Sequence, residues 1–299
     1  MRYSFIIPVY NRPEEVDELL NSLTRQTNKN FEVLVVEDGS SVPCKEVVDN
    51  YADRLDICYY FKSNSGPGQT RNYGAERGHG EYLIILDSDC ILPEGYLAAV
   101  ESELQQQKAD AFGGPDRAHD SFTNIQKAIN YAMTSFFTTG GIRGGKKKMD
   151  KFYPRSFNMG VRAEVYKALG GFSKMRFGED IDFSIRIFQG GYACRLFPEA
   201  WVWHKRRTDL KKFFKQVHNS GIARINLYKK YPKSLKVVHL LPALFTIGIV
   251  FLLLYSLVCS WSLSLLLLFA LIICVDSTLR NKSFKIGLLS ILASFICLL

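Results

Sequence analysis

The chain has 299 residues, of which 47% are hydrophobic and 22% are charged, and its formal net charge is +9. This composition excludes an intrinsically disordered chain. The seven cysteines are scattered and form no C-x-x-C pair, which excludes a disulfide scaffold and a cysteine-type zinc site.

Short apolar runs in the N-terminal third of the chain predict the strands of an α/β sheet. The runs cover residues 4–9, 31–36, 57–61 and 82–86. Helical spacing or helix-start signals occur at residues 14–23, 69–77 and 93–107. Strands and helices in this order predict a mostly parallel sheet with helices on both faces. Ligands of such sheets bind at the carboxyl ends of the strands.

Acidic residues follow two of the predicted strands. Asp87 and Asp89 come directly after the run at 82–86, and Asp38 follows the run at 31–36. Two carboxylates at a strand end can reach one divalent cation, because Mg²⁺ and Mn²⁺ prefer carboxylate and phosphate oxygens. Asp38 lies on the same edge and suits hydrogen bonds to a nucleobase or ribose. A D-x-D pair is also found in solvated turns, so its place after a buried strand carries the interpretation.

Residues 113–155 have a different character because they contain several glycine pairs. We predict a helix around residues 121–137, followed by a basic loop that contains Lys146, Lys147 and Lys148. Such a loop is either purely structural or a flap that closes over a phosphorylated ligand.

A second group of acids opens a predicted helix. Gly178 is followed by Glu179 and Asp180, and the residues as far as Arg186 have amphipathic spacing. Capping and pairing with the helix dipole explain one acid at this position, but they explain a cluster of three less well. Asp180 is therefore a candidate general base if it faces the cleft.

Basic residues are concentrated just before an apolar tail. Residues 205–236 contain eleven lysines and arginines and one acid, whereas residues 237–259 contain no charged residue apart from the titratable His239. The latter run is long enough to span a hydrocarbon core of ~30 Å. Further apolar runs at 263–275 and 286–299 are short for a full span. A basic strip can bind nucleic acid, but its place before the tail favours anionic lipid, and we expect no nucleic-acid partner.

We therefore predict a catalytic domain at residues 1–236, with a basic juxtamembrane helix at 205–236, and two or three transmembrane helices at 237–299. Arg280, Lys282 and Lys285 follow the second apolar run. The positive-inside rule then places the catalytic domain in the cytoplasm, at the inner (plasma) membrane.

Five segments together resemble the family-two glycosyltransferases, which have the GT-A fold. They are SFIIPVYNRP at 4–13, VVEDGS at 35–40, GPGQTRNYGAERGHGEYLIILDSD at 66–89, FNMGVRAEVYKALGGF at 157–172 and GEDIDFSIR at 178–186. They occur in the family's order and spacing. The resemblance implies a GT-A-type, mostly parallel sheet and the inverting transfer of a sugar from a nucleotide-sugar to an acceptor hydroxyl. It also implies a divalent cation, Mn²⁺ or Mg²⁺.

The resemblance assigns a group of residues to the nucleotide and the metal. Those at the nucleotide are Pro8, Val9, Tyr10, Asp38, Arg71 and Asp87. The first three would line the base pocket, and Asp38 would bind the base, usually uracil. Asp87 would approach the ribose and the metal, and Asp89 would bind the metal between the diphosphate oxygens. His204 matches a position that gives some members a further metal or phosphate contact, although a histidine after two tryptophans also fits a structural role.

The resemblance also assigns residues to the acceptor and the catalytic base. Asn158 and Met159 would border the acceptor together with Glu179, Gly160 would allow its close approach, and Asp180 would be the base. The apolar tail suggests that the acceptor is lipid-linked or a polysaccharide. One departure is Glu37, where many members carry Asp, and this exchange keeps the charge.

Two other functions compete with this interpretation. A nucleotidyltransferase would have a glycine-rich loop with Arg and Lys after its first strand, where this chain has PVYNRP. A membrane-anchored nucleotide-sugar-binding module without turnover would look similar, but the presence of Asp38, Asp87, Asp89 and Asp180 argues against it.

Overall fold

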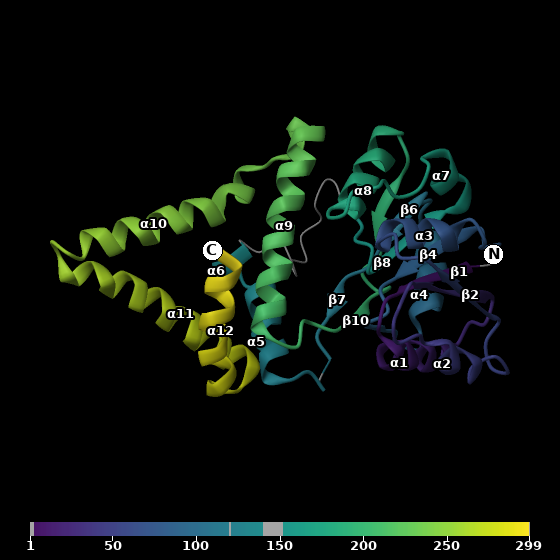
Figure 1. The fold of residues 1–299 in the computed structure, drawn as a ribbon, viewed down its shortest axis with the longest axis horizontal. Coiled ribbons are helices and arrows are strands. Elements are labelled where there is room, and N and C mark those ends of the chain that lie inside the picture. The colour runs from purple at the N-terminus through teal and green to yellow at the C-terminus, as the bar shows by residue number, and fades with distance from the viewer. Residues whose placement is uncertain (1–2, 120, 140–151, 299) are drawn as a thin grey trace. The chain divides into compact units, whose positions relative to one another are not determined.

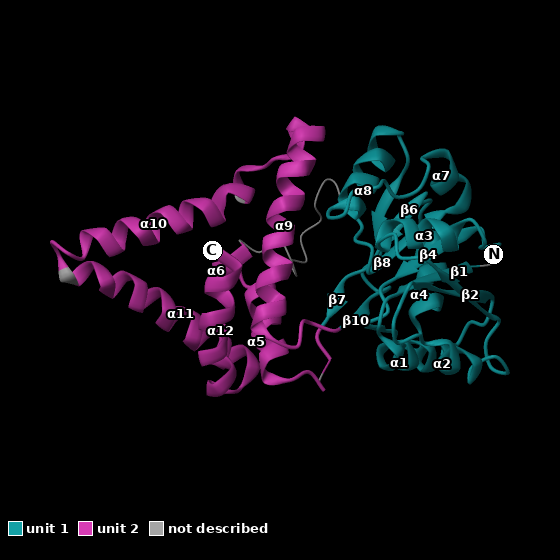
Figure 2. Ribbon diagram, viewed as in Figure 1, with its two compact units in different colours: residues 1–117, 148–204 teal, residues 118–147, 205–299 magenta. Residues whose placement is uncertain are grey.

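The computed structural model describes residues 3–119, 121–139 and 152–298. The chain divides into two compact units, namely residues 1–117 with 148–204 and residues 118–147 with 205–299 (Figure 2). Residue 236, the predicted end of the catalytic domain, falls inside the second unit. The division into a catalytic domain and a membrane segment stays a prediction. The predicted basic loop at Lys146 to Lys148 lies outside the described residues.

A seven-stranded sheet forms the centre of the first unit, with the strand order β3-β2-β1-β4-β8-β6-β9 (Figure 1). Its strands are β1 (Tyr3–Val9), β2 (Phe31–Asp38), β3 (Ile57–Lys62), β4 (Tyr82–Leu86), β6 (Ala111–Gly113), β8 (Asn158–Arg162) and β9 (Cys194–Leu196). Strands β3, β2, β1 and β4 are parallel neighbours, β8 is antiparallel to β4 and β6, and β9 is parallel to β6. The predicted mostly parallel sheet is confirmed.

Helices cover both faces of this sheet. They are α1 (Pro13–Thr24), α2 (Lys45–Asp49), α3 (Pro67–Ala75), α4 (Tyr96–Gln106), α7 (Ala163–Ala168) and α8 (Glu179–Gln189). Phe5 and Ile7 of β1 share one hydrophobic core with residues of α1, α2 and α4. Ile6 belongs to a second core with residues of α7 and α8. Burial on both faces explains why β1, β2 and β4 are continuous apolar runs in the sequence.

A small second sheet lies in the same unit, with the strand order β5-β10-β7. Its strands are β5 (Cys90–Ile91), β10 (Val202–His204) and β7 (Asp116–Arg117). The antiparallel register of β10 and β5 puts His204 opposite Cys90, and therefore next to Asp89. Strands of two or three residues are too short to show a period in the sequence, so this sheet was not predicted.

The second unit is helical. Its elements are α5 (Asn124–Thr134), α6 (Phe136–Thr139), α9 (Leu210–Lys230), η1 (Pro232–Ser234), η2 (Val237–Leu240), α10 (Leu241–Tyr255), η3 (Ser260–Ser262), α11 (Leu263–Asn281) and α12 (Phe284–Leu298). The helix predicted around residues 121–137 is the pair α5 and α6, which are separated at the extended residue Ser135. Thr123 and Gln126 form a capping box that fixes the start of α5.

The tail does not form a separate module within this unit. Helix α12 shares a hydrophobic core with α5 and α9, and this core is made of Ala128, Ile129, Ala132, Met133, Phe213, Ile286 and Ala293. These residues come from both sides of the boundary at residue 236. Removing the tail would therefore expose Phe213 of α9 and one face of α5.

The helix most suited to cross a membrane is not in the first apolar run. Residues 237–259 are divided between η2 and the 15-residue helix α10, which spans only about 22 Å at 1.5 Å per residue. Pro242 in the first turn of α10 favours a helix start there. Among the described residues, α11 is the one helix that is long and apolar enough to span a membrane, with 19 residues. Helix α11 continues to Asn281, beyond Val275, where the second apolar run in the sequence ends.

We predict that Gly160→Ala destabilises the first unit. Gly160 lies in β8 against Phe112 of β6, and a Cβ atom there would lie 2.0 Å from the Phe112 ring. Phe112 is fully buried and stacks on Phe197 at 4.6 Å, so it has little freedom to move. Overpacking of this kind costs about 1–3 kcal/mol or more. Thermal unfolding should show a clearly lower midpoint.

Gly221→Ala is the matched control, because a Cβ atom at Gly221 of α9 meets no atom within 4 Å. In a helix this exchange is neutral or stabilises by up to about 1 kcal/mol. Equal midpoints for the two variants would contradict the packing argument.

Candidate active site

The predicted site acids meet at one edge of the first unit. Strands β2, β1 and β4 are adjacent and parallel, so Asp38 at the end of β2 and the Asp87 to Asp89 turn after β4 lie on the same edge of the sheet. Asp38 and Asp89 are largely buried. Tyr10, which follows β1 at this edge, is 53% exposed.

Asp89 is held between two basic side chains. Arg12 Nη1 lies 2.5 Å from one carboxylate oxygen of Asp89, and His204 Nε2 lies 3.2 Å from the other. Burial by itself would raise the pKa of Asp89, but His204 and Arg12 together lower this pKa below its usual value. Asp89 is therefore a carboxylate at neutral pH, as a metal ligand must be.

Asp89 and His204 fit a divalent cation. Two ligands at right angles on an ion with bonds of about 2.1 Å lie about 3 Å apart, which is close to the 3.2 Å between these two atoms. Cys90 lies in the same cluster, with possible ligand atoms within 4.8 Å of one another. Burial raises the pKa of the Cys90 thiol well above its usual value, and a thiol without its charge is a poor ligand. The candidate donors are therefore a carboxylate and an imidazole.

His204 thus has contacts that suit both of the roles considered for it. Its ring stacks on Phe157 at 4.8 Å, which fixes its orientation, and its Nε2 faces Asp89. Its metal contact stays a prediction.

Asp38 organises the loop that leads into α3. One of its oxygens accepts hydrogen bonds from Lys62 Nζ at 2.7 Å and from the Ser65 N–H at 2.9 Å, and the other accepts from the Gly66 N–H at 2.9 Å. Burial would raise the pKa of Asp38, but the bonds from Lys62 and Ser65 and the charge of Lys62 lower it. The predicted contact between Asp38 and a base stays a prediction. The neighbouring Glu37 is fully buried and accepts the Cys44 N–H at 2.8 Å.

Arg71 joins two parts of the site. This residue of α3 is 4% exposed, and its guanidinium contacts Asp87 Oδ1 at 2.8 Å and Glu179 Oε1 at 2.9 Å. It also lies over the Phe172 ring, 5.3 Å from the ring centre. One buried cation therefore connects the end of β4 with the N-terminus of α8. The prediction that Arg71 contacts the nucleotide is not tested by this arrangement.

The three acids at the start of α8 have different partners. Gly178 precedes them with φ of 86°, a conformation that glycine adopts without strain, and so it allows the turn into the helix. Glu179 binds Arg71, Arg155 Nε donates to Asp180 Oδ2 at 2.6 Å, and Asp182 forms an ion pair with Arg186 at 3.0 Å. Asp182 is fully buried, so its contribution is structural.

Three of the residues predicted at the acceptor lie inside the sheet, in β8, whereas the fourth, Glu179, opens α8. Asn158 is 1% exposed, accepts the Tyr96 hydroxyl at 2.6 Å and donates to the Ala200 carbonyl at 2.8 Å. Met159 is fully buried in a hydrophobic core, and Gly160 faces Phe112. The small size of Gly160 thus makes room for a core ring in this structure. Contact of these residues with an acceptor stays a prediction.

Sequence reasoning missed the basic partners of the acids. Four carboxylates of the site each contact a basic side chain, in the pairs Asp38–Lys62, Asp87–Arg71, Asp89–Arg12 and Asp180–Arg155. Of these basic residues only Arg71 was predicted as a site residue. Arg12 lies in the PVYNRP segment and Arg155 in the segment before FNMG, but an isolated arginine has no spacing that reveals its partner.

The amino-acid sequence matches a known family. Residues 4–170 match the model for Glycosyl transferase family 2, which covers more than half of the chain. The chain therefore belongs to this family, as its motifs predicted.

Individual proteins are also similar to this chain in sequence or in structure. An uncharacterized glycosyltransferase of Rickettsia felis is 32% identical over 137 residues, which are 46% of this chain and 22% of that protein. The chain thus matches only about a fifth of the length of this curated relative. The structure of S. aureus TarS 1-349 in complex with UDP-GlcNAc has a TM-score of 0.56 at 20% identity and covers 76% of this chain and 67% of its own.

The mannosyltransferase PcManGT from Pyrobaculum calidifontis, in complex with GDP-Man and Mn²⁺, has a TM-score of 0.68 at 17% identity. This likeness covers 98% of the present chain and 86% of PcManGT. At these identities the two structures show the fold alone, and they confirm the predicted GT-A class.

We predict that Arg71→Gln strongly destabilises the first unit. The exchange leaves Glu179 and Asp87 without their shared cation, and an uncompensated buried charge costs about 3–5 kcal/mol. Denaturant unfolding of the native chain and of Arg71→Gln measures the difference in their free energies of unfolding.

Arg25→Gln serves as the control, because Arg25 forms an exposed ion pair with Glu94 at 3.9 Å. Exposed pairs contribute about 1 kcal/mol or less. If Arg71→Gln and Arg25→Gln lost the same small amount of stability, the contacts of Arg71 with Asp87 and Glu179 would be unimportant for folding.

Proposed function

We propose that this chain transfers a sugar from a nucleotide-diphosphate sugar to an acceptor hydroxyl, with inversion at the anomeric carbon. The observation that carries the proposal is the arrangement at one edge of the first unit. A charged Asp89 lies beside His204, and through Asp87 and Arg71 this turn is connected to the acids that open α8. Membership of family 2 supports the sugar-transfer class.

The donor is proposed to be UDP-linked and the cofactor to be Mn²⁺ or Mg²⁺. TarS was solved with UDP-GlcNAc, and PcManGT with GDP-Man and Mn²⁺, so both neighbours support a nucleotide-sugar donor and one supports a divalent metal. The choice of uracil rests on the predicted role of Asp38 in the sequence motif.

The proposed reaction needs a charge-neutralised leaving group and a base. A divalent cation on Asp89 and His204 would neutralise the diphosphate. Asp180 would accept the proton of the acceptor hydroxyl while this oxygen attacks the anomeric carbon. The bond from the anomeric carbon to the diphosphate oxygen breaks, and the nucleoside diphosphate leaves with the electron pair. No covalent sugar intermediate forms, so the product has inverted configuration.

We predict that Asp89→Ala abolishes metal-dependent donor binding. The exchange removes the carboxylate that faces His204, so one of two proposed ligands is lost. Calorimetric titration with UDP-sugars and GDP-sugars, each with and without Mn²⁺, measures the effect. Unchanged affinity in the presence of metal would contradict the assignment of Asp89.

We predict that Asp180→Asn leaves donor binding within a few-fold but lowers transfer by at least ~10². The amide keeps the shape of the side chain but cannot accept the proton. A screen of nucleotide-sugars for transfer and hydrolysis compares the variant with the native chain. Transfer at the native rate would place the base elsewhere, and no turnover by the native chain with any donor would favour the binding-module alternative.

We further propose that the second unit binds the cytoplasmic face of the inner membrane, where the acceptor is lipid-linked or a surface polysaccharide. Helix α11 meets the length and composition requirements of a span. Helix α9 carries exposed basic and apolar side chains together, among them Lys211, Lys215 and Phe214. Basic side chains next to aromatic ones are typical of helices that lie at an anionic membrane surface.

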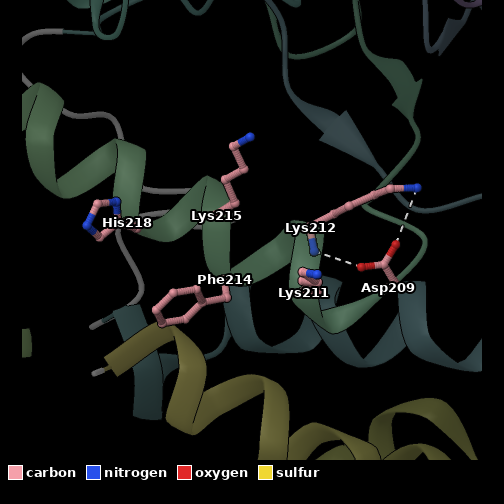
Figure 3. A pocket seen from close by; sticks show the side chains of 6 residues that line it. All are labelled: Asp209, Lys211, Lys212, Phe214, Lys215 and His218. Carbon is pink, nitrogen blue, oxygen red and sulfur yellow. Dashed lines mark hydrogen bonds and ion pairs between the residues drawn. The ribbon is translucent and has the colours of Figure 1, made fainter.

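These α9 side chains line a hollow of about 750 Å³ (Figure 3), formed by Asp209, Lys211, Lys212, Phe214, Lys215 and His218. Asp209 caps the helix and accepts the Lys212 N–H at 2.7 Å. The ammonium groups of Lys211 and Lys215 have no acidic partner among the described residues. They are therefore suited to bind the phosphates of lipid headgroups.

We predict that Lys211→Glu/Lys215→Glu in the full chain weakens binding to anionic vesicles about tenfold or more at low salt. Each lysine near an anionic surface contributes ~1 kcal/mol, and salt screens this within ~10 Å at 0.1 M. Flotation with phosphatidylserine-containing and neutral vesicles over a salt series measures the partition.

Lys108→Glu/Lys167→Glu, which reverses two exposed charges on the first unit, is the control and should leave the partition unchanged. Equal partition of both double variants would show that α9 does not face the membrane.

A further inference from the structure

The proposed base is engaged by an arginine in this structure. Asp180 has a side chain that is 10% exposed, and both of its oxygens are used. Oδ1 accepts the Ile181 N–H at 2.8 Å, and Oδ2 accepts Arg155 Nε at 2.6 Å. The first bond orients the carboxylate on α8. The second brings the positively charged guanidinium of Arg155 against Oδ2, the oxygen that is not held by the backbone.

This contact weakens Asp180 as a base. Burial would raise the pKa of Asp180, but Arg155 lowers it through its charge and its hydrogen bond, and Arg71 lowers it further. The other charged groups nearby are the acids Glu179, which is bound to Arg71, and Asp116 of β7, which also acts on Arg155. Without Arg155, burial would therefore move the pKa of Asp180 upward, in the direction that suits a general base.

Arg71 and Arg155 differ in how firmly they are held. Arg71 has a side chain that is 5% exposed and binds two carboxylates, Asp87 and Glu179. Arg155 is 36% exposed, and its ion pair within the described residues is with Asp180 alone. The Arg155 carbonyl accepts the Asn158 N–H at 3.0 Å, which anchors the backbone at the start of β8. The Arg155 side chain can therefore turn without a change in the sheet.

We propose that Arg155 is a positioning residue that exchanges its partner during the reaction. Before the donor binds, its guanidinium holds Asp180 in place. When a nucleoside diphosphate group enters the site, the guanidinium transfers to the phosphate oxygens, which offer it a planar, bidentate contact. Asp180 is then left as a stronger base at the moment when the acceptor proton must be taken. This inference rests on the proposed function, because it takes Asp180 to be the base.

The dependence of the rate on pH distinguishes this exchange from a permanent ion pair. The acid limb of kcat/KM reports the free enzyme, and the acid limb of kcat reports the enzyme with bound substrate. In Arg155→Gln we expect the kcat/KM limb to move to higher pH by about one unit or more, and the kcat limb to stay where it is. A shift of both limbs, or of neither, would overturn the proposal.

Nucleotide binding provides a second test that does not depend on turnover. Titration with UDP, GDP and the corresponding monophosphates should show that Arg155→Gln weakens the better-bound diphosphate about tenfold and leaves its monophosphate within twofold. An equal effect on both nucleotides, or no effect on either, would contradict transfer of the guanidinium to the diphosphate. Arg155→Lys keeps the charge without the planar fork, and it replaces Arg155→Gln if the latter does not fold.

Arg176→Gln is the matched control, because Arg176 is an exposed arginine in the loop before α8. It should leave both limbs and both affinities unchanged. The failure of the proposed function would appear differently, as transfer by Asp180→Asn at the native rate. An active native chain with an inactive Asp180→Asn and unshifted limbs in Arg155→Gln would overturn the Arg155 proposal alone.

Discussion

A carboxylate that is removed from water needs a compensating cation or several hydrogen bonds, and this requirement organises the edge of the sheet where β1, β2 and β4 end. Arg71 satisfies it for two acids at once, Asp87 after β4 and Glu179 on α8. Because these acids come from segments about 90 residues apart, their shared cation also holds the two halves of the candidate site together. Phe183 and Ile187 pack α8 into the hydrophobic core on the same side, and the Arg71 contact fixes its N-terminus, which carries Asp180.

The same requirement explains why the acids of the site carry basic partners from the chain itself. Each carboxylate that would bind a metal, a nucleotide or a proton is already neutralised, by Arg12, Lys62, Arg71 or Arg155. In the proposed reaction a ligand would compete with these cations, and the partly exposed Arg12 and Arg155 would be easier to move than the buried Arg71. Binding of the proposed anionic donor and release of the acids would thus be coupled by electrostatics.

The second unit is held together by one hydrophobic core to which distant parts of the chain contribute. The final helix, α12, closes a core with α5 and α9, so residues from the tail complete a helical group that begins at residue 118. Helix α9, which carries the side chains proposed to contact the membrane, and the final helix α12 are parts of one folded unit. A basic α9 and a span such as α11 would then present the unit to a membrane together.

Much of the fold was determined by local sequence patterns. Continuous apolar runs identified β1, β2 and β4 because strands buried on both faces need apolar side chains at nearly every position. The edge strand β3 is only partly buried, and Gly178 with its acids marked the start of α8. The motifs of family 2 indicated Asp89, His204 and Asp180. Only the tertiary structure decided that Arg12 and Arg155 neutralise two of these acids, that Asn158 and Met159 point into the core, and that α12 packs on α5. The physical reason is that burial and charge pairing depend on residues brought together from distant parts of the chain, and no periodicity along the sequence records such pairs.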